Sequence, residues 1–117
     1  MTTGSLLLLA AALLSLDVTR SSVAEDQRPL HLRVEREGNQ LVARVIARAS
    51  PPVRVRFVLE INAPSFTRHA GLVEARPSEQ VISTIRFRAA DEWTARLTVK
   101  PATGGTYVED AEAGNLG

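Results

Sequence analysis

The segment from Val53 to Ile61 reads Val-Arg-Val-Arg-Phe-Val-Leu-Glu-Ile, in which apolar side chains alternate with charged ones. Successive side chains of a β-strand point to opposite faces, so this period of two predicts a strand with one apolar and one charged face. The same alternation returns from Val81 to Arg88 and from Trp93 to Lys100. The pattern predicts an antiparallel all-β protein that exposes arginines on flat sheet.

Further strands are expected before this segment. Leu30 to Glu35 alternates and leads into Glu37-Gly38-Asn39, a turn composition that predicts a hairpin with a strand from Leu41 to Ala49. Ser50-Pro51-Pro52 ends that second strand, because proline has no N–H to donate to the ladder.

The second half of the chain is less regular. Residues 62–71 are predicted to form a loop, followed by a brief edge strand at Leu72-Val73. In the strand that starts at Val81, the inward positions are expected to be Val81, Ser83, Ile85 and Phe87. A last strand starts at Thr106, and residues 109–117 are expected to be an acidic, disordered tail after a domain at 30–108.

Six clear strands and one weak one predict an immunoglobulin-like antiparallel β-sandwich of about seven strands. The sequence has no cysteine, so the sandwich has no disulfide and thiol chemistry is excluded. A closed barrel remains the alternative, because alternation does not show which strands pair.

The first 24 residues are expected to be a secretory signal. Leu6 to Leu16 is apolar apart from Ser15, which is too short to cross a bilayer but suits a signal peptide. Small residues at Ser22 and Ala24 predict cleavage between Ala24 and Glu25, with a flexible start at 25–29 and a periplasmic location. No Lys or Arg precedes the apolar run, so an uncleaved membrane anchor stays as the alternative. After cleavage no membrane contact is expected.

The formal net charge of +1 conceals an uneven distribution. From Arg28 to Val108 there are thirteen basic and seven acidic residues, a local excess of six. Such a surface favours an anionic partner. Two outer faces are candidates for binding it. The primary face is Arg54, Arg56, Arg96 and Lys100, and the second is Arg44, Arg48, Arg86 and Arg88, with Arg33 on the same side.

Catalytic and metal sites are not indicated. His31 and His69 are far apart in sequence and have no second ligand at a metal-binding spacing, so both are expected to be surface histidines, His69 in a loop. No serine lies in a nucleophile-elbow pattern. Nucleic acid is not an expected partner, because aromatic side chains for base stacking are few. We expect no enzyme activity and no cofactor.

Three stretches resemble the cysteine-free alphaproteobacterial branch of the curli assembly chaperones. They are Ala49-Ser50-Pro51-Pro52-Val53-Arg54-Val55-Arg56-Phe57, Ser65-Phe66-Thr67-Arg68-His69-Ala70-Gly71 and Trp93-Thr94-Ala95-Arg96-Leu97, and the resemblance spans about Leu30 to Tyr107. It implies an immunoglobulin-like periplasmic protein that stops a secreted curli subunit from nucleating amyloid. The Cys-x-Cys motif of the enteric branch is absent, which excludes a redox role here.

The expected partner is therefore an unfolded curli-type amyloid subunit, held transiently by charge on a monomeric sandwich. The competing hypothesis is an exported immunoglobulin-like structural or adhesion module that adds an extended peptide to a sheet edge. That alternative requires a long unprotected edge strand, and the candidates for it are Leu72-Val73 and the strand at Tyr107.

Overall fold

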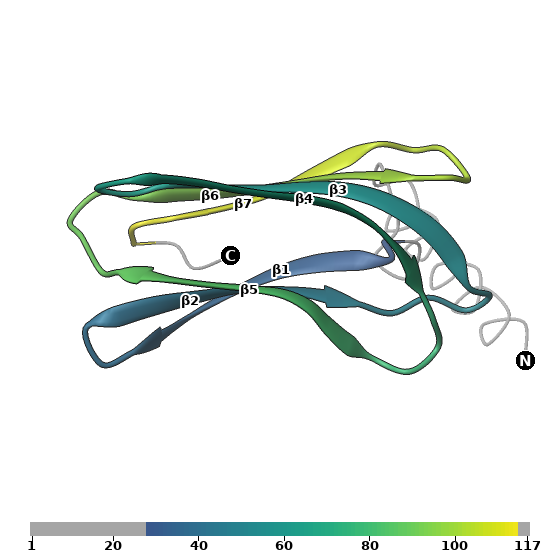
Figure 1. The fold of residues 1–117 in the computed structure, drawn as a ribbon, viewed down its shortest axis with the longest axis horizontal. Coiled ribbons are helices and arrows are strands. Elements are labelled where there is room, and N and C mark those ends of the chain that lie inside the picture. The colour runs from purple at the N-terminus through teal and green to yellow at the C-terminus, as the bar shows by residue number, and fades with distance from the viewer. Residues whose placement is uncertain (1–27, 115–117) are drawn as a thin grey trace, which may run out of the picture.

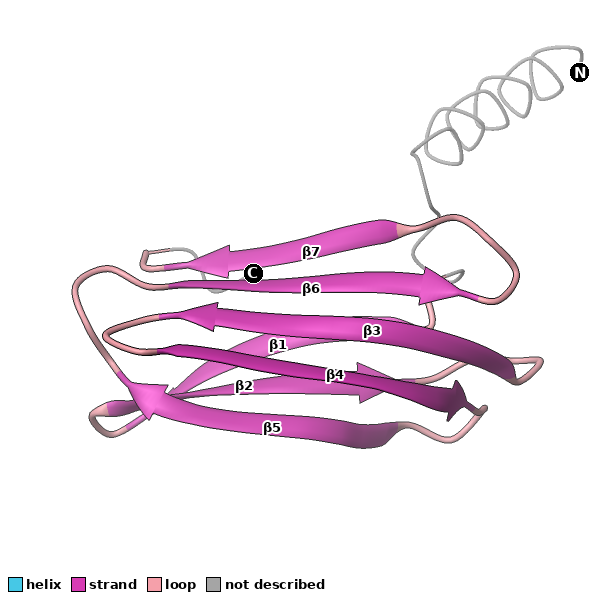
Figure 2. Cartoon of the chain, turned by 45° about the horizontal axis from the view of Figure 1, so that its top comes forward, coloured by secondary structure: helices cyan, strands magenta, loops and turns pink. Residues whose placement is uncertain are grey.

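The computed structural model describes residues 28–114 and arranges them as seven β-strands in two layers (Figures 1 and 2). The strands are β1 (Leu30–Glu37), β2 (Gln40–Ala47), β3 (Val53–Asn62), β4 (Phe66–Ala75), β5 (Gln80–Arg88), β6 (Thr94–Pro101) and β7 (Tyr107–Glu112). The predicted signal peptide at residues 1–24 lies outside the described residues. Within residues 28–114, no helix is present that could cross a membrane.

The strands divide between a three-stranded sheet and a four-stranded sheet. Sheet A has the order β1-β2-β5, and sheet B has the order β4-β3-β6-β7; all neighbours are antiparallel. The two sheets face each other across one core (Figure 1). The immunoglobulin-like sandwich is thus confirmed, and the closed barrel is excluded because the two sheets are separate.

The core is built from the inward positions predicted by the alternation. Val55, Leu59 and Leu97 have no exposed surface, and Leu41 is almost fully buried on the facing sheet. Trp93 packs edge to face against Phe87, with ring centroids 5.5 Å apart. No buried polar or charged residue is found among the described residues, so packing of apolar side chains holds the sheets together.

β4 corrects the prediction of a loop at residues 62–71 and a brief strand at Leu72-Val73. β4 has ten residues and pairs with β3 along its whole length, from Asn62 opposite Phe66 to Val53 opposite Ala75. As an edge strand it is exposed on much of both faces, which removes the alternation that would reveal it. A Cβ at Gly71 would lie only 3.1 Å from Cε1 of Phe57, so the absence of a side chain at Gly71 leaves room for the ring of Phe57 on the neighbouring strand.

β7 corrects the prediction of a disordered tail at 109–117. Residues 109–112 belong to β7, which pairs with β6 from Val99 opposite Tyr107 to Thr94 opposite Glu112. Residues 113–114 form a turn, and 115–117 lie outside the described part. The acidic side chains of Glu109, Asp110 and Glu112 are therefore part of sheet B. When they are counted with the folded domain, the excess of basic over acidic residues is three for residues 28–114, compared with six for residues 28–108.

A bulge in sheet A corrects the inward placement of Val81. The register of β2 and β5 shifts between Val45 and Ile46, so that Val45 faces Ser83 while Ile46 faces Val81. A bulge adds one residue to a strand and reverses the faces beyond it. Val81 is consequently 54% exposed, and Ile82 packs against the core instead.

β7 also ties sheet B to the edge of sheet A. The hydroxyl of Tyr107 donates to the carbonyl of Leu30 at 2.6 Å and accepts from its N–H at 3.0 Å. A carboxylate oxygen of Glu109 accepts from the N–H of Leu32 at 2.8 Å. Polar backbone groups on the free edge of β1 are thus bonded to side chains from the other sheet.

Candidate functional site

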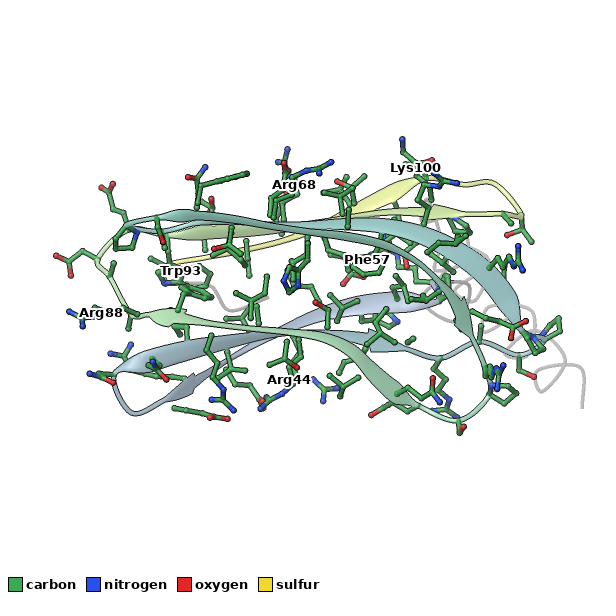
Figure 3. All side chains as sticks on the ribbon, in the orientation of Figure 1. Arg44, Phe57, Arg68, Arg88, Trp93 and Lys100 are labelled. Atoms are coloured by element: carbon green, nitrogen blue, oxygen red, sulfur yellow. The ribbon has the colours of Figure 1, made fainter. Side chains whose placement is uncertain are left out.

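The outer face of sheet B brings side chains from four strands into cross-strand rows. The register places Arg68, Glu60, Arg96 and Asp110 in one row, and Leu72, Arg56 and Lys100 in another. Figure 3 shows Arg68 and Lys100 pointing away from the core on this side, whereas Phe57 and Trp93 lie between the sheets. The predicted primary residues Arg54, Arg56, Arg96 and Lys100 do share this face.

Arg96 lies in a row of alternating charge. Its Nε donates to Asp110 at 2.8 Å, and on the far side of Glu60 the Nε of Arg68 lies 3.9 Å from the Glu60 carboxylate. The hydrogen bond from Arg96 to Asp110 raises the pKa of Arg96 above its ordinary value. Arg96 is thus already paired with an acid and contributes little free positive charge.

Arg54, Arg56 and Lys100, here called the basic triad, have no ion pair with any described residue. Arg56 is directly opposite Lys100, and Arg54 lies two residues before Arg56 on the same face of β3. The one acid opposite the triad is Glu74, across from Arg54, but its carboxylate accepts from Arg76 at 3.0 Å. The positive charge of sheet B is therefore concentrated at the triad.

Apolar side chains lie beside the triad on the same surface. Leu72 is opposite Arg56 and 56% exposed, and Val108 on β7 is 44% exposed. Phe66 lies at the other end of β4 and is 57% exposed. A partner on this face meets charge and hydrophobic surface together, which suits a flexible polypeptide better than a small ion.

Sheet A carries the second predicted set, and two of its four arginines are paired with acids. Arg44 donates to Glu35 at 2.6 Å and to Glu37 at 3.2 Å, and Arg86 donates to Glu37 at 2.9 Å. The hydrogen bonds from Arg86 and Arg44 lower the pKa of Glu37. Within residues 28–114 neither Arg48 nor Arg88 has an ion pair, and they stand at opposite ends of the sheet.

The two histidines take structural positions. Nδ1 of His31 is 3.2 Å from a carboxylate oxygen of Glu109 at the β1/β7 edge. His69 lies in β4, not in a loop, and its Nδ1 is 2.9 Å from Oγ of Ser83 in β5. The described residues contain no group of three or more His, Cys, Asp or Glu side chains placed to hold a metal ion.

These features define a class of protein: a cysteine-free immunoglobulin-like sandwich with an uncompensated basic cluster on its larger sheet. No family model matches the sequence, and no curated protein sequence matches it. The solution structure of CsgH from R. palustris is similar to this chain, with a TM-score of 0.51 and 12% sequence identity. The alignment covers 69% of this chain and 87% of CsgH. The resemblance to the curli assembly proteins is thus confirmed at the level of the fold.

Proposed function

We propose that this chain is a non-enzymatic periplasmic chaperone that keeps a curli-type subunit from nucleating amyloid. R. palustris CsgH, whose fold it shares, is a curli assembly protein. The client in this proposal is an unfolded subunit with acidic side chains, and the surface that captures it is the basic triad of Arg54, Arg56 and Lys100.

The observation that supports this location is the cross-strand pair of Arg56 and Lys100. Like charges directly opposite each other on a sheet destabilise it. In sheet A the register also sets Arg33 opposite Arg44, but there Arg44 is bound to Glu35, and on sheet B Arg96 is bound to Asp110. At the triad the repulsion has no such compensation within the described residues, and binding of an anionic partner would relieve it.

Such a surface suits brief capture. Uncompensated charge attracts an acidic chain over distance and raises the rate of encounter. Each exposed ion pair contributes only about 0.2–1 kcal/mol, which permits rapid release. The guanidinium groups of Arg54 and Arg56 can bind carboxylates through two hydrogen bonds each, and Leu72 beside them offers apolar contact.

Charge reversal of the triad tests the proposal. The lag time of fibril formation by a curli-type subunit is followed with an amyloid dye at chaperone-to-client ratios well below one. The wild-type protein should lengthen the lag, and Arg56→Glu with Lys100→Glu should lose most of this effect. The matched comparison is Arg36→Glu with Arg88→Glu, which reverses two unpaired, exposed arginines of sheet A and gives the same net charge.

The two double variants separate location from net charge. A larger loss in the triad variant supports capture on sheet B. Equal losses would show that charge on sheet A contributes as much as the triad and would overturn the assignment to the triad. A wild-type protein that leaves the lag time unchanged would overturn the chaperone function itself.

A second candidate function is favoured by β4. This edge strand is ten residues long and its outer edge has no partner strand among the described residues. An extended peptide that adds to such an edge gains backbone hydrogen bonds. A module of this kind binds one peptide per molecule, so an effect that saturates only at one-to-one stoichiometry would favour it over the chaperone.

A further inference from the structure

A hollow of about 530 Å³ lies at one end of the outer face of sheet A, on the opposite layer from the basic triad. Its lining includes Arg28, His31, Arg33, Ile46, Arg48 and Glu79. The register explains this grouping: His31 is opposite Ile46, and the N–H of Arg48 bonds to the carbonyl of Pro29 at 2.8 Å. Ile46, only 5% exposed, forms an apolar floor between arginines.

The hollow holds part of the positive charge that remains on sheet A once the ion pairs are subtracted; Arg36 and Arg88 carry the rest at the far end of the sheet. Arg44 and Arg86 are bound to Glu35 and Glu37 farther along the sheet. Arg33 and Arg48 have no ion pair in the part of the chain that the structure describes, and Glu79 is the one acid on the lining. The local balance is therefore positive.

Arg28 adds a buried donor without an acceptor. Its guanidinium is held in place by Glu109, 3.2 Å from Nη1, and by the ring of Tyr107, whose centroid is 4.9 Å from Cζ. Its Nε is buried and has no hydrogen-bond partner among the described residues. A buried N–H of this kind is costly to leave unbonded and calls for an acceptor nearby.

We propose that this hollow is a binding site for an oxyanion, with Nε of Arg28 as a fixed donor and the guanidinium groups of Arg33 and Arg48 as mobile donors. Guanidinium groups match carboxylate and phosphate oxygens in shape and charge. The shared ligand chemistry is an oxygen-bearing anion, supplied either by a free inorganic anion or by the carboxylate of an acidic peptide. The site is separate from the triad and does not depend on the chaperone function.

The test uses the mature chain labelled with ¹⁵N, in which the Nε–H resonances of the arginines report directly on the hollow. Sodium phosphate is titrated against sodium chloride at equal ionic strength. The Nε–H signal of Arg28 should shift in a saturable way with phosphate and not with chloride. A short acetylated Asp-rich peptide is then added to the phosphate-bound protein. Competition by the peptide identifies a carboxylate site, and its absence identifies a site for the free anion.

Variants establish that the arginines of the hollow are responsible. Arg33→Gln with Arg48→Gln should weaken phosphate binding by about tenfold or more, equivalent to the loss of one strong charge contact. Arg36→Gln with Arg88→Gln removes the same charge from the far end of sheet A and should preserve binding. Arg28 is left intact because it also bonds to Glu109. Equal weakening in both variants, or no saturable shift at Arg28, would overturn the proposal.

Discussion

At the scale of single residues, Glu109 connects the two sheets. Its carboxylate accepts from the N–H of Leu32 and lies 3.2 Å from both Arg28 and His31, while its side chain is only 16% exposed. Burial raises its pKa, but the hydrogen bonds from His31, Leu32 and Arg28 outweigh burial, so the net pKa is lowered. The folded state therefore favours the ionised carboxylate.

The lowered pKa of Glu109 gives a prediction for stability against pH. A carboxyl whose folded pKa lies below its ordinary value stabilises the fold above that ordinary value, and the contribution is lost as pH falls through the folded pKa. Glu109→Gln should therefore lower the free energy of unfolding by about 1–2 kcal/mol at neutral pH. The gap to wild type should close below the ordinary carboxyl pKa of 4.5. Urea unfolding at several pH values measures it.

The control for this measurement is Glu112→Gln. Glu112 lies on the same strand, is exposed, and has no ion pair among the described residues. It should unfold like the wild-type protein throughout. An equal pH dependence in wild type and Glu109→Gln would show that Glu109 does not contribute in this way.

At the scale of elements, the strands that alternate cleanly were predictable, whereas only short parts of the two strands at the borders of sheet B were predicted. β3 and β6 are central strands of sheet B, so their alternation directly reflects burial. In β4 polar and small side chains occupy both faces, and only pairing with β3 makes it a strand. In β7 the charged Glu109 occupies an inward position, which breaks the alternation of apolar and polar residues. Its carboxylate is stabilised there by Leu32 and His31 of β1 and by Arg28.

The candidate site was also predictable only in part. The alternation of side chains along each strand is enough to place the predicted arginines on two outer faces. The acids that neutralise some of them depend on register: Glu35 and Glu37 lie on the same hairpin as Arg44 and reach it diagonally, so these ion pairs could have been inferred from the predicted hairpin. Asp110 reaches Arg96 only because β7 continues past Val108, where the sequence predicted a disordered tail.

Asp110 of β7 therefore reduces the positive charge that sheet B exposes, because it pairs with Arg96. Asp110→Asn removes the acid bound to Arg96 and should lengthen the lag time of client fibrils by about twofold, a small effect because one exposed charge contributes little. Glu112→Gln makes the same change in net charge on the same strand without releasing an arginine, and should leave the lag near wild type. Equal lengthening by both variants would contradict a role for Arg96.

At the scale of the whole molecule, the distribution of charge matters more than its total. Residues 28–114 carry thirteen basic and ten acidic side chains, and most of the acidic side chains form ion pairs with arginines. What remains positive is confined to the triad, the hollow of sheet A and a few isolated arginines. The triad is on sheet B and the hollow is on sheet A, so an unfolded client at the triad and a small anion in the hollow would not compete directly.

Salt dependence follows from this distribution. Attraction between exposed charges is screened beyond about 10 Å at 0.1 M salt, so inhibition by the wild-type protein should weaken steadily as sodium chloride rises. The lag time of the client alone is measured at each salt concentration and subtracted. The variant Arg56→Glu with Lys100→Glu should show almost no remaining salt response. Inhibition by the wild type that is constant with salt would exclude electrostatic capture.

The side chains of Tyr107 and Glu109 along the edge of β1 have a consequence for self-association. Growth of a fibril requires every added unit to offer an open edge on both sides of its sheet. The N–H groups of Leu30 and Leu32 are already bonded within the molecule, so sheet A cannot accept a new strand along that part of β1. A molecule that added to a growing fibril through β5, the other edge of sheet A, would offer the next subunit only the β1 edge, whose N–H groups are already bonded. Growth of the fibril would stop at that molecule.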